Sequence, residues 1–202
     1  MRRGLSGLFL TAVLLIGPVA PASADIAEAY AAYNRGEFKK AFAEFSALAE
    51  KGNSIAQANL GFMYYRGQGV EQNYAEAIKW YRRAAERGRS WAQYNLAVIY
   101  HFGEANTPAD IAEAVKWYRL AAAQGDPDAR FNLGGLYELG QGVDRDLVLA
   151  YMWYALSVAV SLPGADQDAA VESRDAVAKQ LSPADLEQAK KLVTEWKPAS
   201  AP

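Results

Sequence analysis

The sequence contains no cysteine and a single histidine, His101. Without cysteine, the chain can form neither a disulfide nor a lipid-modified cysteine anchor. With one histidine and no thiolate, it cannot assemble a zinc site from the usual ligands. We therefore expect a protein that works without a metal ion or a cofactor.

The common sequence signatures of catalysis are also missing. Neither Gly-x-Ser-x-Gly nor Ser-x-x-Lys occurs, and these mark the main classes of serine acyl-transfer enzymes. The Gly-x-Gly pairs follow predicted helices and precede no Lys-Ser or Lys-Thr pair, so there is no P-loop. We expect that the protein is not an enzyme. Folding can still bring two acidic side chains together, and this leaves a hydrolase as an alternative.

An excess of basic charge is absent as well. The chain has 21 Lys and Arg against 23 Asp and Glu, for a formal charge of −2. Residues 1–24 hold two of the arginines and no acidic residue, so the remainder carries 19 basic against 23 acidic residues, or −4. A mildly acidic chain has no electrostatic footprint for nucleic acid or anionic lipid. We expect neither as a partner.

Residues 1–24 match a secretory signal peptide. Arg2 and Arg3 form a basic start, residues 8–16 form an apolar core, and Ala22-Ser23-Ala24 is a small-x-small cleavage site. The apolar run is too short to span a bilayer as a helix. We expect cleavage before Asp25, no membrane insertion afterwards, and a monomer in the periplasm if the source is bacterial.

The rest of the chain is organised around a repeat. Ala-Gln-Ala-Asn-Leu-Gly at 56–61 returns as Ala-Gln-Tyr-Asn-Leu-Ala at 92–97 and as Ala-Arg-Phe-Asn-Leu-Gly at 129–134. Trp-Tyr pairs follow at 80–81, 117–118 and 153–154, so every offset is 36 or 37 residues. A fixed period of this size indicates a stacked array of supersecondary units. The three units are predicted at 52–88, 89–125 and 126–161.

Each unit is predicted to contain an A helix and a B helix. The A helices begin near Asn53 or Asp126, whose side chains can satisfy free amides of a first turn. They end at Gly67 or Gly140, because a left-handed cap costs glycine least.

The second unit departs from this pattern. Its loop, Gly-Glu-Ala-Asn at 103–106, lacks the second glycine of the Gly-x-Gly loops in the other two units. Its B helix is predicted to start with Thr107 as N-cap and Pro108 at the first helical position.

The flanking segments complete the stack. Residues 25–51 match a shorter, degenerate tetratricopeptide-like hairpin. Residues 147–164 carry no charge, and a helix that is apolar all round needs cover on every side. Residues 166–196 are predicted to supply it as a C-terminal capping hairpin, which an open solenoid end needs. The Pro- and Ala-rich tail, 197–202, is predicted to be disordered.

Four motifs recur together at this period: Ala-x-x-Asn-Leu-Gly-x-x-Tyr, Gly-x-Gly-Val, Ala-x-x-Trp-Tyr and Ala-Ala-x-x-Gly. Over roughly residues 37–160 the chain thereby resembles the Sel1-like repeat family of tetratricopeptide-like hairpins. The resemblance implies an all-α protein, a right-handed α-solenoid whose A helices line a concave face. It also implies binding of proteins or peptides, often in bacterial envelope signalling or assembly.

One asparagine returns in the middle of each A helix, at Asn59, Asn95 and Asn132. Asparagine is a mediocre helix former, so its return needs a reason. Its amide could hold the backbone of an extended peptide, as in tetratricopeptide superhelices whose inner asparagine precedes a Leu-Gly pair. Alternatively, each amide bonds a neighbouring helix or loop carbonyl and holds the stack together. Both accounts stay open.

The same register predicts which other side chains lie on the concave face. Besides the asparagines, the candidate peptide-binding residues are Tyr65, Arg66, Trp91, His101 and Glu138. The stripes Tyr64/Tyr100/Tyr137 and Trp80/Trp117/Trp153 are predicted to be core.

Three functions follow, from different classes. The favoured one is an exported adaptor or regulator that binds a protein or extended peptide in the concave groove. The second is a cell-wall hydrolase or ligand-binding protein of the β-lactam or peptidoglycan type, since some members of this family are described as binding or hydrolysing β-lactams. The third is a scaffold that binds through its convex face.

Overall fold

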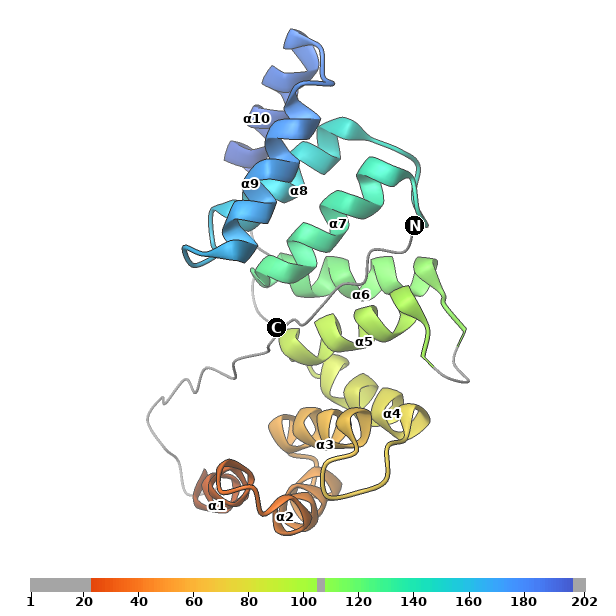
Figure 1. Ribbon diagram of the computed structural model, residues 1–202, viewed down its shortest axis with the longest axis vertical. Helices are drawn as coiled ribbons and strands as arrows, with labels where there is room; N and C mark the ends of the chain where they lie inside the picture. Colours follow the sequence, from red (N-terminus) through yellow and green to blue (C-terminus); the bar gives the residue numbers. More distant parts are fainter. Residues whose placement is uncertain (1–22, 105–107, 198–202) are drawn as a thin grey trace.

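The computed structural model describes residues 23–104 and 108–197. Within these ranges the protein has ten α-helices and no β-strand, stacked as a solenoid (Figure 1). The prediction of an all-α solenoid is confirmed. The helices are α1 (Ser23–Asn34), α2 (Phe38–Glu50), α3 (Ser54–Arg66), α4 (Tyr74–Ala85), α5 (Ser90–Phe102), α6 (Ile111–Ala123), α7 (Pro127–Leu139), α8 (Leu147–Val158), α9 (Ala165–Ala178) and α10 (Pro183–Glu195).

Two sequence predictions fall largely outside the described residues. Only Ser23 and Ala24 of the predicted leader are described, and they form the start of α1. Of the predicted tail, only Lys197 is described.

Each helix from α1 to α8 packs against the next one in the chain, and α10 packs against α8. The A helices of the three units are α3, α5 and α7, and the B helices are α4, α6 and α8. No residue of the uncharged helix α8 is exposed, because α7, α9 and α10 all pack against it. The uncharged segment is longer than this helix, however. It continues into a turn where Leu162 is 82% exposed.

A buried tyrosine of each B helix, at positions 81, 118 and 154, packs against the A helix of its own unit. Gly61 and Gly134 make room for two of these rings. A Cβ atom would lie 2.9 Å from the ring of Tyr81 in the first case and 2.6 Å from that of Tyr154 in the second. In the predicted core stripes, Trp80 and Tyr137 are buried, and the other four residues are half-buried against the core.

The predicted helix ends of the first and third units are confirmed. Asn53 and Asp126 cap α3 and α7 with their side chains, and Gly67 and Gly140 end these helices in the left-handed conformation.

The predicted start of the second unit's B helix is wrong. Helix α6 begins at Ile111, and Pro108 lies before it, while Thr107 lies outside the described residues. The N-cap is Asp110, whose Oδ1 accepts the Glu113 backbone N–H at 3.0 Å. Asn73 and Asp146 make the same bond at the starts of α4 and α8. An Asn or Asp side-chain oxygen in repeat register therefore marks the start, and the local Thr-Pro pair does not.

Each Gly-x-Gly loop packs against the B helix of the preceding hairpin. Gly69 lies against the start of α2, where a Cβ atom would be 2.2 Å from the Phe38 carbonyl oxygen. Gly142 lies against the start of α6, where a Cβ atom would be 2.7 Å from Cγ2 of Ile111. The second glycine of each loop is therefore required by a close approach to the preceding B helix.

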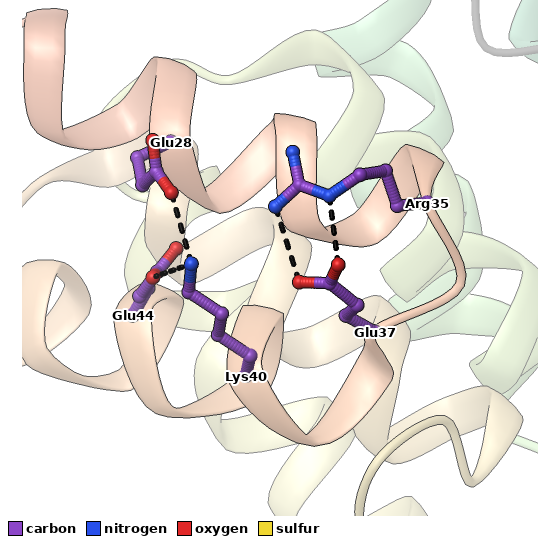
Figure 2. A network of polar contacts seen from close by, with 5 residues as sticks. All are labelled: Glu28, Arg35, Glu37, Lys40 and Glu44. Atoms are coloured by element: carbon purple, nitrogen blue, oxygen red, sulfur yellow. Dashed lines mark hydrogen bonds and ion pairs between the residues drawn. The ribbon is translucent and has the colours of Figure 1, made fainter.

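The first hairpin, α1 and α2, has a charged surface (Figure 2). Lys40 Nζ lies 2.9 Å from Glu28 Oε1 and 3.7 Å from Glu44 Oε1, and Arg35 Nε lies 2.8 Å from Glu37 Oε1. Exposed ion pairs of this kind add little stability. Their effect is to make the exposed surface of this hairpin polar.

Candidate functional site

The three repeated asparagines all use their amide nitrogen in the same way. The Nδ2 atom donates to the carbonyl oxygen four residues earlier in its own helix. The distances are 2.8 Å from Asn59 to Ile55, 2.7 Å from Asn95 to Trp91, and 2.8 Å from Asn132 to Asp128. Asn59 Nδ2 also donates to the Tyr30 hydroxyl of α1 at 2.7 Å, which ties the first unit to the preceding hairpin.

These bonds restrict what the asparagines can offer a ligand. Asn95 is only 9% exposed, whereas Asn59 and Asn132 are half-buried. Asn59 uses both N–H groups of its amide within the protein, so it would bind a peptide through its amide oxygen, whereas Asn95 and Asn132 each use one N–H in these bonds. The peptide-binding role of the three asparagines stays a prediction.

Tyr65, His101 and Glu138 occupy one repeat position near the ends of α3, α5 and α7. The Tyr154 hydroxyl donates to Glu138 Oε2 at 2.8 Å, and His101 Nδ1 lies 3.3 Å from the Tyr118 hydroxyl. In the second and third units, this position therefore contacts the buried tyrosine of the B helix. Tyr65 instead donates to Glu104 Oε1 at 3.0 Å, across to the loop of the next unit.

Burial shifts the pKa of two of these three residues. Burial, and after it the negative charge of Glu104, raises the pKa of Tyr65 to about 12. Burial also lowers the pKa of His101, so the imidazole is neutral at pH 7. This repeat position thus presents hydrogen-bonding groups in Tyr65 and His101 and an acidic side chain in Glu138, without a cation.

The remaining two candidates differ in exposure. Trp91 is half-buried, with its ring 5.7 Å from that of Phe62 and 5.9 Å from that of Tyr81, so it packs between the first and second units. Arg66 is exposed at the last position of α3. The equivalent residues of α5 and α7 are Phe102 and Leu139, which are 57% and 65% exposed. We call the surface that carries these three positions and the three asparagines the A-helix face.

Sequence reasoning assigned no role to a buried polar position that recurs in the three A helices. Gln57 and Gln93 donate from Nε2 to Ala49 and Ala85 at 3.1 and 3.0 Å, and Arg130 donates from Nε to Ala122 at 3.1 Å. In each case the acceptor is the carbonyl eight residues earlier, at the end of the preceding B helix. We call this contact the polar clamp. The signal was present in the repeat, as the residue after the first alanine of each motif.

Asp126, the N-cap of α7, has a perturbed protonation equilibrium. Burial raises its pKa from 3.8 to about 6, although its hydrogen bond from the Ala129 backbone N–H acts in the opposite direction. The neighbouring Asp128 has a raised pKa as well, through burial and the charge of Asp166. The folded protein therefore binds a proton at Asp126 more tightly than the unfolded chain does.

The variant Asp126→Asn is expected to stabilise the protein more at pH 7.5 than at pH 5. Since the folded pKa is raised, the stability that protonation provides is present below about pH 4 and is lost as the pH rises through about 6. Asparagine cannot ionise but keeps the cap, as Asn53 does in the first unit. The expected gain at pH 7.5 is on the order of 1–3 kcal/mol. Thermal melting at both pH values measures it, and an equal gain at both would contradict the assignment.

Comparison with known protein families identifies the repeat. The sequence profile described as "Sel1 repeat" matches residues 54–88, 92–126 and 127–159, together just over half of the chain. The chain belongs to the Sel1 repeat family. Sel1 repeat proteins typically mediate protein–protein interactions, and their solenoid is typically a non-enzymatic scaffold. No curated protein sequence matches this Sel1 repeat protein significantly.

One solved structure has a similar fold. A Sel1 repeat protein from Oxalobacter formigenes is 29% identical, with a TM-score of 0.69 over 77% of this chain and 60% of that one. This Sel1 repeat protein thus spans about 60% of the length of that relative. Further matches are c5321, a protective antigen of uropathogenic Escherichia coli displaying an SLR fold (20% identity, TM-score 0.26, 87% and 61% coverage), and immunity protein Pa5087 of Pseudomonas aeruginosa (17%, 0.36, 91% and 90%).

Between residues 23 and 197, apart from 105–107, no helix has the length and apolar character needed to cross a bilayer.

Proposed function

We propose that this Sel1 repeat protein is an exported adaptor of the cell envelope that binds an extended segment of a partner protein along its A-helix face. The observation that carries the proposal is the exposure of Phe102 and Leu139. They end α5 and α7 at equivalent positions, one repeat apart. Side chains that become fully desolvated near the centre of an interface carry most of its binding energy.

The surroundings of these two residues suit a peptide backbone. The His101 ring stacks on Phe102, with ring centroids 4.3 Å apart, and stiffens an otherwise exposed side chain. Glu138 and the amide oxygens of the asparagines offer acceptors at the same period. An extended segment would meet an apolar anchor and an acceptor in each of two successive units.

Photo-crosslinking in the native envelope tests the proposal. A benzophenone amino acid is placed at position 102, and in a matched control at position 75, an exposed alanine of the B helix α4. We expect crosslinks to a defined partner from position 102, lost when Leu139→Ser is added. Crosslinks from position 75 alone would instead support binding through the convex face.

The cellular location of the protein is tested in the same cells. The predicted signal peptide supports export, and the mature protein is expected in the periplasmic fraction with Asp25 as its first residue. N-terminal mass spectrometry of the fractionated protein measures this, and an intact leader in the cytoplasmic fraction would refute export.

The asparagines are expected to separate into two kinds. Asn59→Ala removes a bond to Tyr30 that joins two hairpins, so it should lower the free energy of unfolding by about 1 kcal/mol or more. Asn132→Ala removes a bond to Asp128 within α7 and should leave the melting temperature nearly unchanged. If the A-helix face holds a peptide, Asn132→Ala weakens partner binding several-fold, since one net hydrogen bond contributes roughly 0.5–1.5 kcal/mol. If Asn132→Ala lowers the melting temperature but leaves the affinity for the partner unchanged, Asn132 has only a structural role.

A further inference from the structure

A recess of about 380 Å³ lies away from the A-helix face, where α2, α3 and α4 meet. Gln57 contributes to its wall and is only 3% exposed. Its Nε2 donates to Ala49 in the polar clamp, but its Oε1 is buried and has no hydrogen-bond partner among the described residues. A buried acceptor left unpaired costs free energy, so this oxygen favours a donor.

The next unit contains the group that fits such an oxygen. Gln93 is the equivalent of Gln57 and makes the same clamp bond, to Ala85. Its Oε1 accepts a hydrogen bond from Gln124 Nε2 at 2.7 Å. The protein therefore fills this position in its second unit with a primary carboxamide.

The first unit has no carboxamide of its own to pair with Gln57. The residue in register with Gln124 is Arg87, and its guanidinium donates to the Gly52 carbonyl instead. In the third unit, Arg130 replaces the glutamine, and its second donor reaches the Leu156 carbonyl at 2.9 Å. Among the three clamps, only that of Gln57 combines an unpaired oxygen with an adjoining recess.

The rim of the recess has the complementary polarity for the same group. Arg83 and Arg87 supply N–H donors, and Glu50 and Glu86 supply carboxylate acceptors. A carboxamide has one acceptor oxygen and two N–H donors, so it can serve both kinds of rim group and Gln57 at once. A carboxylate has no donor for the Gln57 oxygen, and an apolar side chain has neither donor nor acceptor.

We propose that this recess is a second binding site, which takes the primary carboxamide of a glutamine or asparagine side chain of a partner protein. The carboxamide N–H donates to Gln57 Oε1, and its oxygen accepts from a guanidinium at the rim. Arg87 is exposed and turns away from Gly52 when the carboxamide enters. The site is separate from the A-helix face and does not depend on the function proposed for it.

Titrations followed by NMR of the isotope-labelled protein test the site with small probes. The probes are N-acetyl-glutamine N-methylamide and its asparagine homologue, against the glutamate and methionine compounds with the same backbone. We expect the side-chain amide of Gln57 and the backbone amide of Gly52 to shift with the two carboxamide probes, with dissociation constants on the order of 1 mM. The other two probes should bind at least tenfold more weakly. Equal shifts with all four, or none with the carboxamides, would overturn the proposal.

Two variants of Arg87 provide the matched control. Arg87→Gln introduces the side chain that Gln124 supplies to Gln93, so it should raise the melting temperature and weaken carboxamide binding more than tenfold. Arg87→Ala removes one of the two rim guanidinium groups but leaves Arg83 and does not fill the recess, so it should weaken binding less than Arg87→Gln does. Binding by Arg87→Gln equal to that of Arg87→Ala would show that the carboxamide does not occupy this position.

Discussion

The variant Gly69→Ala is expected to lower the free energy of unfolding by about 3 kcal/mol or more, whereas Gly36→Ala should cost only about 1 kcal/mol. The two glycines have nearly the same backbone conformation, with φ of +75° and +78°, so both variants carry the strain of a left-handed residue. They differ in what the new methyl group meets. At Gly36 nothing lies within 4 Å, but at Gly69 the Cβ atom would be 2.2 Å from the Phe38 carbonyl oxygen.

The contact at Gly69 cannot be relieved by a side-chain rotation, because the backbone fixes the position of the Cβ atom and the atoms it meets are themselves backbone. The loop would have to withdraw from the start of α2, which loosens the joint between the first hairpin and the first unit. Gly142 should fall between the other two, since the nearest atom to its added Cβ is the Cγ2 methyl of Ile111 at 2.7 Å. Urea unfolding of the three single variants measures the series. Equal destabilisation at Gly36 and Gly69 would show that the loop does not press on α2.

The variant Arg130→Ala should also destabilise the protein by about 3 kcal/mol or more. The Arg130 guanidinium is buried, donates to the Ala122 and Leu156 carbonyls, and lies 4.4 Å from the ring centre of Trp196. Its removal leaves two carbonyl oxygens without these donors, at about 1–3 kcal/mol for each buried one, and a cation–π contact of about 0.5–2 kcal/mol. Burial lowers the pKa of Arg130, but the nearby charge of Asp126 acts in the opposite direction.

A matched variant separates these contributions. Arg130→Gln can keep the clamp bond to Ala122, as Gln57 and Gln93 do, while it loses Leu156 and Trp196. Its cost should be about half that of Arg130→Ala, and Trp196→Ala should cost more than the cation–π contact alone, because it also removes the contact with Trp153. Chemical unfolding of the three variants gives the order. If Arg130→Gln were as damaging as Arg130→Ala, the clamp bond would contribute nothing in the third unit.

Much of the fold was predictable because its information is local and repeated. The period placed the A and B helices, and Asn53 and Gly67 marked ends that the structure confirms, since a cap acts within one turn. The start of α6 was missed for the opposite reason. Thr107 and Pro108 formed a plausible local start, whereas Asp110 is recognised only by its alignment with Asn73 and Asp146.

The candidate site was less predictable, because a side chain's partner depends on three-dimensional placement. An asparagine in the middle of a helix can bond its own backbone, the next helix or a ligand, and only the coordinates show that Asn132 bonds Asp128. The polar clamp was missed because its acceptor lies eight residues back, across a helix–helix turn. No helical periodicity connects such positions, so Gln57 and Gln93 carried no visible role in the sequence.

The polar clamp also bears on how a protein of this kind can grow. Gln57 and Gln93 form the same bond to a B-helix alanine, so a duplicated copy of the first or second unit would find a matching neighbour on either side. Arg130 is different, because it needs the Leu156 carbonyl and the Trp196 ring of the C-terminal helices. In evolutionary terms, the array can accept an additional repeat unit before the third unit. A unit inserted after it would separate Arg130 from its partners in the C-terminal helices. Longer descendants of this chain should therefore have gained their extra units upstream of Asp126.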